Sequence, residues 1–131
     1  AAAKALGLAR HIPVHGYGCL SLVAAMARAQ SASHAAVDVI MTGGHGEYFF
    51  EAFNDAGHSI APARSVLPEL LPTVAVADHV AGDIAPERAD RVWTDILPEA
   101  RAWAYLPDDH ALPPVPVYGR APDAKPAAVR A

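Results

Sequence analysis

Two histidines in the stretch HIPVH, His11 and His15, have a spacing that could bind a metal ion. On a helix, H-x-x-x-H brings both imidazole rings to one ion. Pro13 stands between them, and proline is excluded from a regular helix interior. On a strand, the two residues would lie about 13 Å apart, too far for one ion. We therefore expect no metal site and no cofactor, since no matching carboxylates accompany the other histidines, His34, His45, His58, His79 and His110.

The glycine-rich stretch TGGHGEYFFEAFNDAG, at 42–57, could be a phosphate cradle, a metal site or the bend of a hairpin. A phosphate loop needs backbone N–H groups at a helix N-terminus and usually a lysine. Here the glycines lie between two apolar segments, 37–43 and 47–53, which are both typical of strands. We therefore predict an antiparallel hairpin, with a backbone nest that touches an anion as the alternative.

The hairpin makes a specific prediction for its turn. A three-residue connection needs residues with positive φ, so at least one of Gly43, Gly44 and Gly46 should have a positive φ angle. Glu47 follows the turn directly. We expect Glu47 to be a polar edge residue rather than a general base.

Nucleophilic catalysis has few candidates in this sequence. Cys19 stands near the start of a predicted helix, a position that can activate a thiol, but no histidine and asparagine context accompanies it. We expect a buried structural thiol. The serines lie outside any G-x-S-x-G elbow, and the adjacent Asp108 and Asp109 are expected in a solvated loop. The residues alone therefore predict no active site.

Composition narrows the class of protein. The 131 residues fit one domain, and an apolar fraction of 53% is enough for a core. The net charge is −4 and no lysine or arginine block exists, which argues against a nucleic-acid surface. One cysteine excludes an internal disulfide framework and suits a reducing compartment. With no long apolar run and no signal peptide, we expect a cytoplasmic protein without a membrane span.

Helical and strand patterns alternate along the chain, which indicates an α/β domain with a mixed sheet and flanking helices. One domain is expected over 1–131, with 107–131 as an extended, proline-rich tail. Helices are expected at 2–10, 19–29, 65–71, from Asp83 to about 97, and at 99–106. Strands are expected at 12–17, 37–43, 47–53, 58–64 and 73–78.

The first residues have the pattern of a helix, but they include no capping side chain, because Ala1 to Ala3 are all alanines. A helix normally begins after Ser, Thr, Asp or Asn. We therefore expect this chain to be the later part of a longer protein.

Four blocks in a fixed order resemble the TsaB-type proteins, also called YeaZ. The first resembles the family's A-K-G-L-A-x-x-x-x-I-P-h-x-G-h-S-S-L segment, where h is apolar, and the second its hairpin. The third is similar to its later apolar strand, and the fourth to its P-x-Y-x-R-x-x-D-A-K tail. These blocks are AAAKALGLARHIPVHGYGCLSLVA at 1–24, VDVIMTGGHGEYFFEAFNDAG at 37–57, TVAVADHVAG at 73–82 and PPVPVYGRAPDAKP at 113–126.

The resemblance implies a fold and a role. The family has the actin-like and sugar-kinase-like (ASKHA) ATPase fold of two related halves, and this chain would be the second. TsaB-type proteins are non-catalytic partners in making threonylcarbamoyladenosine in tRNA, although older names label them glycoproteases. The implied partners are a TsaD-type catalytic paralogue and a TsaE-type ATPase, with a homodimer through the absent first half as a further expectation. HIPVH is not the metal motif of the TsaD-type proteins, because it lies in a different block.

The resemblance also marks positions for structure or contact. In the hairpin these are Gly43, Gly44, Gly46 and Glu47, although the family's D-A-R reads Thr42-Gly43-Gly44 here. In the tail we expect docking towards the first half, and its marked residues are Tyr118, Arg120, Asp123 and Lys125, with Gly119 where a larger apolar residue is common. Two other functions stay open: a metal- or nucleotide-dependent hydrolase, and an unrelated small α/β binding module.

Overall fold

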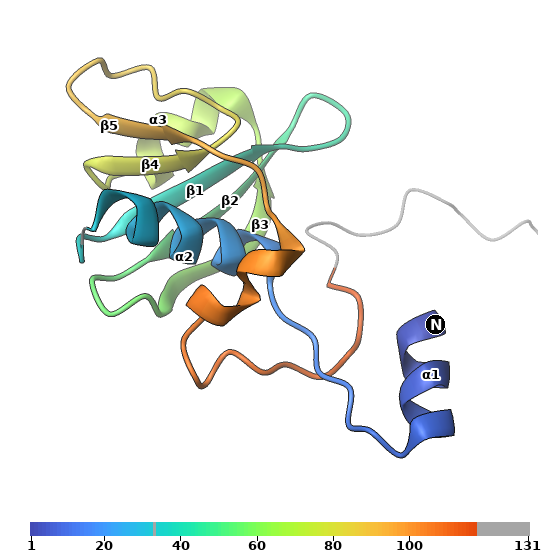
Figure 1. Cartoon of the computed structure of the whole chain (residues 1–131). Helices are drawn as coiled ribbons and strands as arrows, with labels where there is room; N and C mark the ends of the chain where they lie inside the picture. The colour runs from blue at the N-terminus through green and yellow to red at the C-terminus, as the bar shows by residue number, and fades with distance from the viewer. Residues whose placement is uncertain (33, 118–131) are drawn as a thin grey trace, which may run out of the picture.

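The computed structural model describes residues 1–32 and 34–117, and it is built around one sheet of five strands in the order β3-β2-β1-β4-β5 (Figure 1). The predicted α/β class, with a mixed sheet and flanking helices, is confirmed. The elements are α1 (Ala2–Arg10), α2 (Cys19–Ser31), β1 (Val37–Thr42), β2 (Tyr48–Phe53), β3 (Ser59–Val66), the 3-10 helix η1 (Pro68–Leu70), α3 (Leu71–Val74), β4 (His79–Gly82), β5 (Val92–Asp95) and the 3-10 helix η2 (Ala100–Tyr105).

The sheet is antiparallel on one side of β1 and parallel on the other. Short turns join β1 to β2 and β2 to β3, so these neighbours run antiparallel. After β3 the chain crosses one face of the sheet through η1 and α3 and then returns beside β1, where β4 pairs parallel to it. β5 pairs parallel to β4 and completes the other edge. The predicted hairpin of β1 and β2 is confirmed, with Val37 opposite Phe53 and Thr42 opposite Tyr48.

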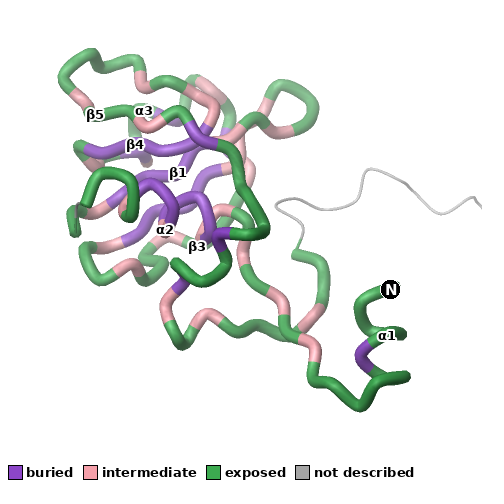
Figure 2. The backbone as a smooth tube through the Cα atoms, viewed as in Figure 1, coloured by how far each residue is buried: buried purple, intermediate pink, exposed green. Residues whose placement is uncertain are grey.

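The larger core lies between the sheet and α2. Alternate residues of β1, Val37 and Val39, point to this face and are fully buried. They contact the apolar stripe of α2, which repeats at helical spacing as Leu22, Val23, Met26 and Ala27. Figure 2 shows this buried stretch of α2 lying over the buried centre of the sheet.

The opposite face of the sheet has its own smaller core. Ile40 and Phe50, which pair across β1 and β2, are buried there with Val80 of β4. Leu71 at the start of α3 and Ala75 after it cover them. The central strands are therefore buried on both faces, which explains why β1 is apolar almost throughout.

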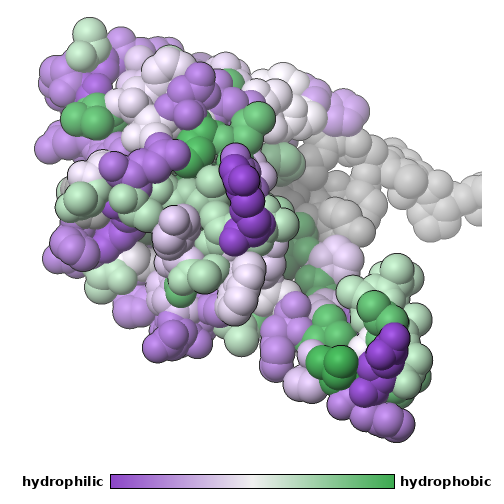
Figure 3. All heavy atoms as spheres, viewed as in Figure 1, coloured by the Kyte–Doolittle hydropathy of each residue, from purple (hydrophilic) through white to green (hydrophobic). Residues whose placement is uncertain are grey.

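α1 stands apart from the body, at the end of an extended segment (Figure 1). Gly7 is its buried residue, and a Cβ there would lie 2.3 Å from Cγ2 of Val14 in that following segment. Leu6 and Leu8 are 62% and 79% exposed. Figure 3 shows apolar side chains at the surface of this helix.

The predicted strand at 12–17 is wrong. This segment contains one isolated antiparallel bridge, between Gly16 and Leu112. It runs outside the sheet, so no neighbouring strand is there to extend the pairing. The expected helices at 2–10 and 19–29 are confirmed as α1 and α2, and Gly18 is the N-cap residue of α2.

In residues 65–78, neither the predicted helix nor the predicted strand has the expected bounds. The expected helix at 65–71 begins too early, because β3 pairs with β2 as far as Val66, and Ser65 lies opposite Phe49 in this pairing. The expected strand at 73–78 is wrong, because its first residues belong to α3 and the strand begins only at His79. Pro72 lies in the first turn of α3, where proline is favoured.

The helix expected from Asp83 to about residue 97 is also wrong. Residues 92–95 of this segment form β5, which pairs with β4 from Val92 opposite His79 to Asp95 opposite Gly82. The Trp93 indole donates a hydrogen bond to the Gly82 carbonyl at 3.1 Å, which adds to this pairing. The helical segment at 99–106 is confirmed as η2, in its 3-10 form. Among the helices of the described residues, none is long and apolar enough to cross a membrane.

Candidate functional site

The turn between β1 and β2 holds four of the positions marked in the sequence. The Glu47 N–H donates to the Gly44 carbonyl at 3.2 Å, and this bond closes a four-residue turn. The two central residues, His45 and Gly46, have φ angles of 59° and 79°. Positive φ at both positions is the mark of a type I′ turn, the connection whose twist matches two antiparallel strands. The prediction of positive φ among the turn glycines is confirmed at Gly46.

The glycines of the turn differ in what requires them. At Gly43 a Cβ would lie 2.6 Å from the Glu47 carbonyl oxygen, so the close approach of the two strands requires a residue without a side chain. Gly46 has open space around it, and its positive φ is the reason for glycine. Gly44 meets neither condition, since no atom lies within 4 Å of its Cβ position and its φ is not in the left-handed region.

The hydrogen bonds around this turn favour a structural role over anion binding. The Gly43 N–H donates to the Glu47 carbonyl at 3.0 Å, and the Thr42 N–H donates to Asp83 Oδ1 at 2.7 Å. Together with the amide of Glu47, three N–H groups are already used. The Asp83 carboxylate also brings a negative charge to the base of the turn. Asp83, the first residue of the expected helix, therefore ties the ends of β1 and β4 together.

Glu47 is half-buried where the turn joins β2. Its backbone makes both of the turn's cross-strand bonds, one as donor and one as acceptor. Its use as a contact residue stays a prediction. The marked residues of the tail lie outside the described part of the chain; they are Tyr118, Arg120, Asp123 and Lys125.

The two other candidates from the sequence do not gather into a site. His11 is the C-cap residue of α1, with a φ of 54°, and His15 lies in the extended segment that follows. Cys19 is exposed, so the expected buried thiol is wrong. The burial of α2 begins only at Leu22, because its first turn lies outside the contact with the sheet. Within 1–32 and 34–117, no three of the histidines, cysteines and carboxylates are grouped to hold a metal ion.

The structure buries three ionisable groups whose burial was not predicted from the sequence. The first is Asp38 in β1, which is 2% exposed. Its Oδ2 accepts the Ala77 N–H at 2.7 Å. Burial raises the pKa of Asp38, and the Ala77 hydrogen bond and the charge of Arg91 act against this rise. The carboxylate therefore fixes the chain just before β4, and an aspartate inside an apolar strand was the signal for it.

Glu51 and His79 are the other two buried groups, and both lie on the α2 face of the sheet. Burial raises the pKa of Glu51, while a hydrogen bond with the Ser59 side chain lowers it. Burial also lowers the pKa of His79, and the nearby Arg28 charge adds to this effect. His79 Nε2 lies 2.8 Å from Thr94 Oγ1 in β5. Asp38 points to the opposite face, so these groups do not converge on one reacting centre.

Arg28, near the end of α2, is a further residue that the sequence did not single out. Its Nη1 donates to the carbonyls of Ala35 at 2.8 Å and Asn54 at 3.1 Å, and its Nη2 donates to the carbonyl of Asp55. One side chain thus holds the loop after α2 and the β2–β3 turn. The lone basic residue in an alanine-rich helix was the available signal, but its acceptors lie up to 27 residues away.

Comparison of this chain with known proteins identifies solved structures that share its fold. No protein-family model and no curated protein matches the chain. Two solved structures are similar to it. YeaZ from Pseudomonas aeruginosa has a TM-score of 0.64 and 21% identity over 79% of this chain and 53% of its own. An uncharacterised protein with similarity to peptidase YeaZ from Pseudomonas aeruginosa has a TM-score of 0.63 and 22% identity over 89% and 63%. The chain therefore has the fold of a YeaZ structure over most of its length, and it spans 53% and 63% of the lengths of those two chains.

Proposed function

We propose that this chain is the C-terminal half of a two-lobed TsaB-type protein and acts as a non-catalytic partner subunit in making threonylcarbamoyladenosine in tRNA. The observation that carries the proposal is the shared fold with YeaZ, combined with four sequence blocks in the family's order. The proposed whole has the ASKHA fold of two related halves. The coverage supports this, since the chain matches 53% and 63% of the two solved chains.

The non-catalytic part of the proposal is supported by what the ionisable side chains do. Asp38 fixes the chain before β4, His79 lies beside Thr94, and Asp83 closes the base of the hairpin. Each group is used in holding the sheet together. At the base of the hairpin turn, the amides of Thr42, Gly43 and Glu47 are bonded within the chain, which also favours a structural part.

The proposed partners are a TsaD-type catalytic paralogue and a TsaE-type ATPase, and a homodimer would form through the first half. The test is to purify the complete product of the gene that encodes this chain together with the TsaD-type and TsaE-type proteins of the same organism. We expect a complex in size-exclusion chromatography and modified tRNA by mass spectrometry only when all the proteins are present.

Two outcomes would overturn this function. One is a full rate of tRNA modification in a mixture without the protein. The other is hydrolysis of peptides or nucleotides by the isolated protein that chelation abolishes, which would favour the hydrolase alternative. The half-protein proposal has a separate test, since the reading frame before Ala1 should encode a block like G-P-G-S-F-T-G. Its absence there would contradict the assignment to a second half.

A further inference from the structure

A groove runs along the solvent side of α2 and is independent of the hairpin. Its volume is about 520 Å³, within the range of roughly 300 to 1,000 Å³ typical of small-molecule sites. One wall is the outer edge of α2, from Ser21 to Ala29. The other wall is formed by the β2–β3 turn at Gly57 and by the residues around η2, including Tyr105 and Pro107.

The floor of the groove is made of small residues. Five alanines line it, and three of them, Ala24, Ala25 and Ala29, belong to α2, so this side of the helix carries short side chains. Tyr105 is 61% exposed and supplies an aromatic surface on the far wall. An open apolar floor beside an exposed aromatic ring suits a flat apolar group, which could stack on the ring at an offset.

The charge of the groove is opposite to that of the chain. The chain has 14 acidic residues against 10 basic ones. The residues that line the groove nevertheless include Arg28 and His34 and no aspartate or glutamate. The full charge among these lining residues is that of Arg28, which complements an anion rather than a cation.

Arg28 is held so that part of its guanidinium remains available. A guanidinium has five N–H donors, and three of those of Arg28 bind the carbonyls of Ala35, Asn54 and Asp55. Its Nε–H and the second N–H of Nη2 make no hydrogen bond to the described residues. Gly57 lies beside this edge, since a Cβ there would be 3.8 Å from Nε, in ordinary van der Waals contact. The three carbonyls fix the donors in advance, which reduces the entropy lost on binding.

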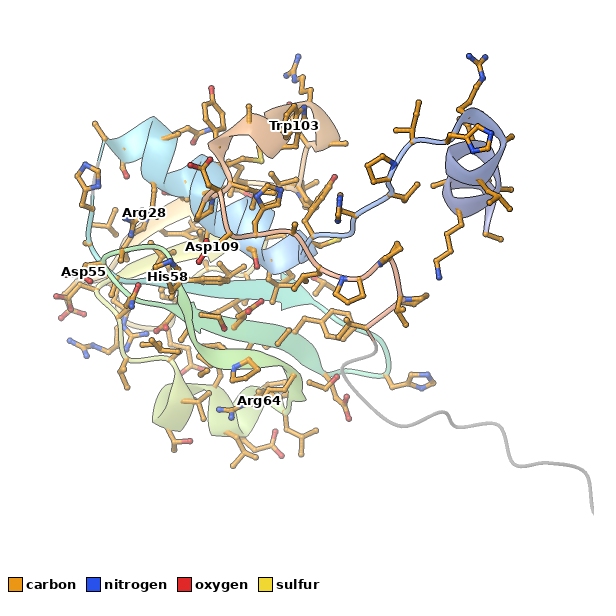
Figure 4. The ribbon with its side chains drawn as sticks, turned by 90° about the horizontal axis from the view of Figure 1, so that it is seen from below. Arg28, Asp55, His58, Arg64, Trp103 and Asp109 are labelled. Atoms are coloured by element: carbon orange, nitrogen blue, oxygen red, sulfur yellow. The ribbon has the colours of Figure 1, made fainter. Side chains whose placement is uncertain are left out.

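The neighbouring carboxylates do not neutralise this arginine. Figure 4 shows Asp55, His58 and Asp109 near Arg28 at one end of α2. Asp109 Oδ2 lies 3.3 Å from His58 Nε2, so its contact is with this histidine rather than with Arg28. Asp55 reaches Arg28 through its backbone carbonyl. Over the part of the chain that the structure describes, no carboxylate forms an ion pair with Arg28.

We propose that this groove binds a small aromatic carboxylate. The carboxylate accepts hydrogen bonds from the two available N–H donors of Arg28, and the ring lies on the alanine floor against Tyr105. A charged, two-point hydrogen bond fixes the orientation, and the flat floor selects a planar body over a branched one. The site is argued independently of the partner-subunit function, because none of the residues that line the groove belongs to the β1–β2 hairpin.

The test is a titration of the intact chain with 2-naphthoate, followed by two-dimensional ¹H–¹⁵N NMR. The neutral analogue 2-naphthalenemethanol is titrated in parallel. We expect shifts in the amides of α2 near Arg28, in the β2–β3 turn and in the Arg28 side-chain Nε–H. The carboxylate should bind about tenfold more tightly than the alcohol, the factor expected when a charged hydrogen bond is lost.

Two tryptophan substitutions make a matched pair of variants. Ala29→Trp fills the groove from an exposed position of α2 without removing any bond of Arg28, and it should weaken naphthoate binding at least about tenfold. Gln30→Trp adds the same side chain to an exposed neighbour that does not line the groove, and it should bind as the unmodified chain does.

Three results would overturn the proposal. The first is the absence of NMR shifts for the groove amides at about 10 mM naphthoate, a concentration well above the dissociation constant expected for a specific site. The second is equal binding of the acid and the alcohol, which would remove the role of Arg28. The third is equal binding by the two tryptophan variants, which would place the ligand elsewhere. Unchanged tRNA modification by the Ala29→Trp protein would leave the partner-subunit function standing, so the two proposals fail separately.

Discussion

Replacing Gly82 by alanine should lower the free energy of unfolding more than replacing either Gly44 or Gly46 of the hairpin turn. Gly82 ends β4 with a φ of 123°, a backbone conformation open to glycine and costly for residues with a side chain. A Cβ there would lie 2.0 Å from the Ile40 carbonyl oxygen in β1. Backbone strain of this kind costs about 1–3 kcal/mol, and forcing extra atoms into a packed core costs about 1–3 kcal/mol more. We therefore expect Gly82→Ala to lower the free energy of unfolding by about 3 kcal/mol or more.

The hairpin glycines supply graded controls for this measurement. Gly46 has positive φ but open space, so Gly46→Ala should cost about 1–2 kcal/mol. Gly44 has neither constraint, and Gly44→Ala should change stability by less than about 1 kcal/mol in either direction. Urea unfolding followed by far-ultraviolet circular dichroism gives all three values. Equal stabilities of the Gly82 and Gly44 variants would refute the argument from backbone geometry.

Three further predictions concern polar side chains. Burial raises the pKa of Glu51 above its ordinary 4.5, so the stability from this group is present below that pH and is lost as pH rises through the folded pKa. The free energy of unfolding of Glu51→Gln should therefore increase relative to that of the unmodified chain from pH 4 to pH 7. A gain independent of pH in urea unfolding would contradict this. Burial lowers the pKa of His79 below 6.5, so the stability from this group is present above pH 6.5 and is lost as pH falls through the folded pKa. His79→Gln should therefore reduce the loss of stability at acid pH. An unchanged dependence of stability on pH would exclude His79 as the cause of that loss. Asp83→Ala removes the acceptor of the Thr42 N–H and should cost about 0.5–1.5 kcal/mol, a value that thermal unfolding can check against the exposed control Asp108→Ala.

The sequence by itself determined the elements whose signals are local. The apolar stripe of α2 repeats within thirteen residues, and the glycine turn between β1 and β2 lies between two segments of high strand propensity. The predicted connection of three residues was short enough to require antiparallel strands, and the observed connection, 43–47, is also short. The mixed sheet followed from that hairpin, since a chain of alternating helices and strands also favours parallel neighbours.

Only the tertiary structure decided the region after β3. Apolar side chains recur at helical spacing over 89–97, yet residues 92–95 form β5 because the edge of β4 offers unpaired backbone groups. The same competition ends α3 at Val74 and delays β4 to His79, opposite Val37 of β1. Strand pairing between distant segments outweighs a local preference of a few tenths of a kcal/mol per residue.

The groove and the buried charges were decided in the same way. Arg28 is one arginine on an alanine-rich helix until the β2–β3 turn brings the carbonyls of Asn54 and Asp55 to it. Asp38 reads as an interruption of an apolar strand until the Ala77 N–H reaches its carboxylate. A side chain's partners are set by the path of the whole chain, whereas the sequence around it sets only its own helix or strand. The hairpin glycines could therefore be found from the sequence, and the surroundings of Arg28 could not.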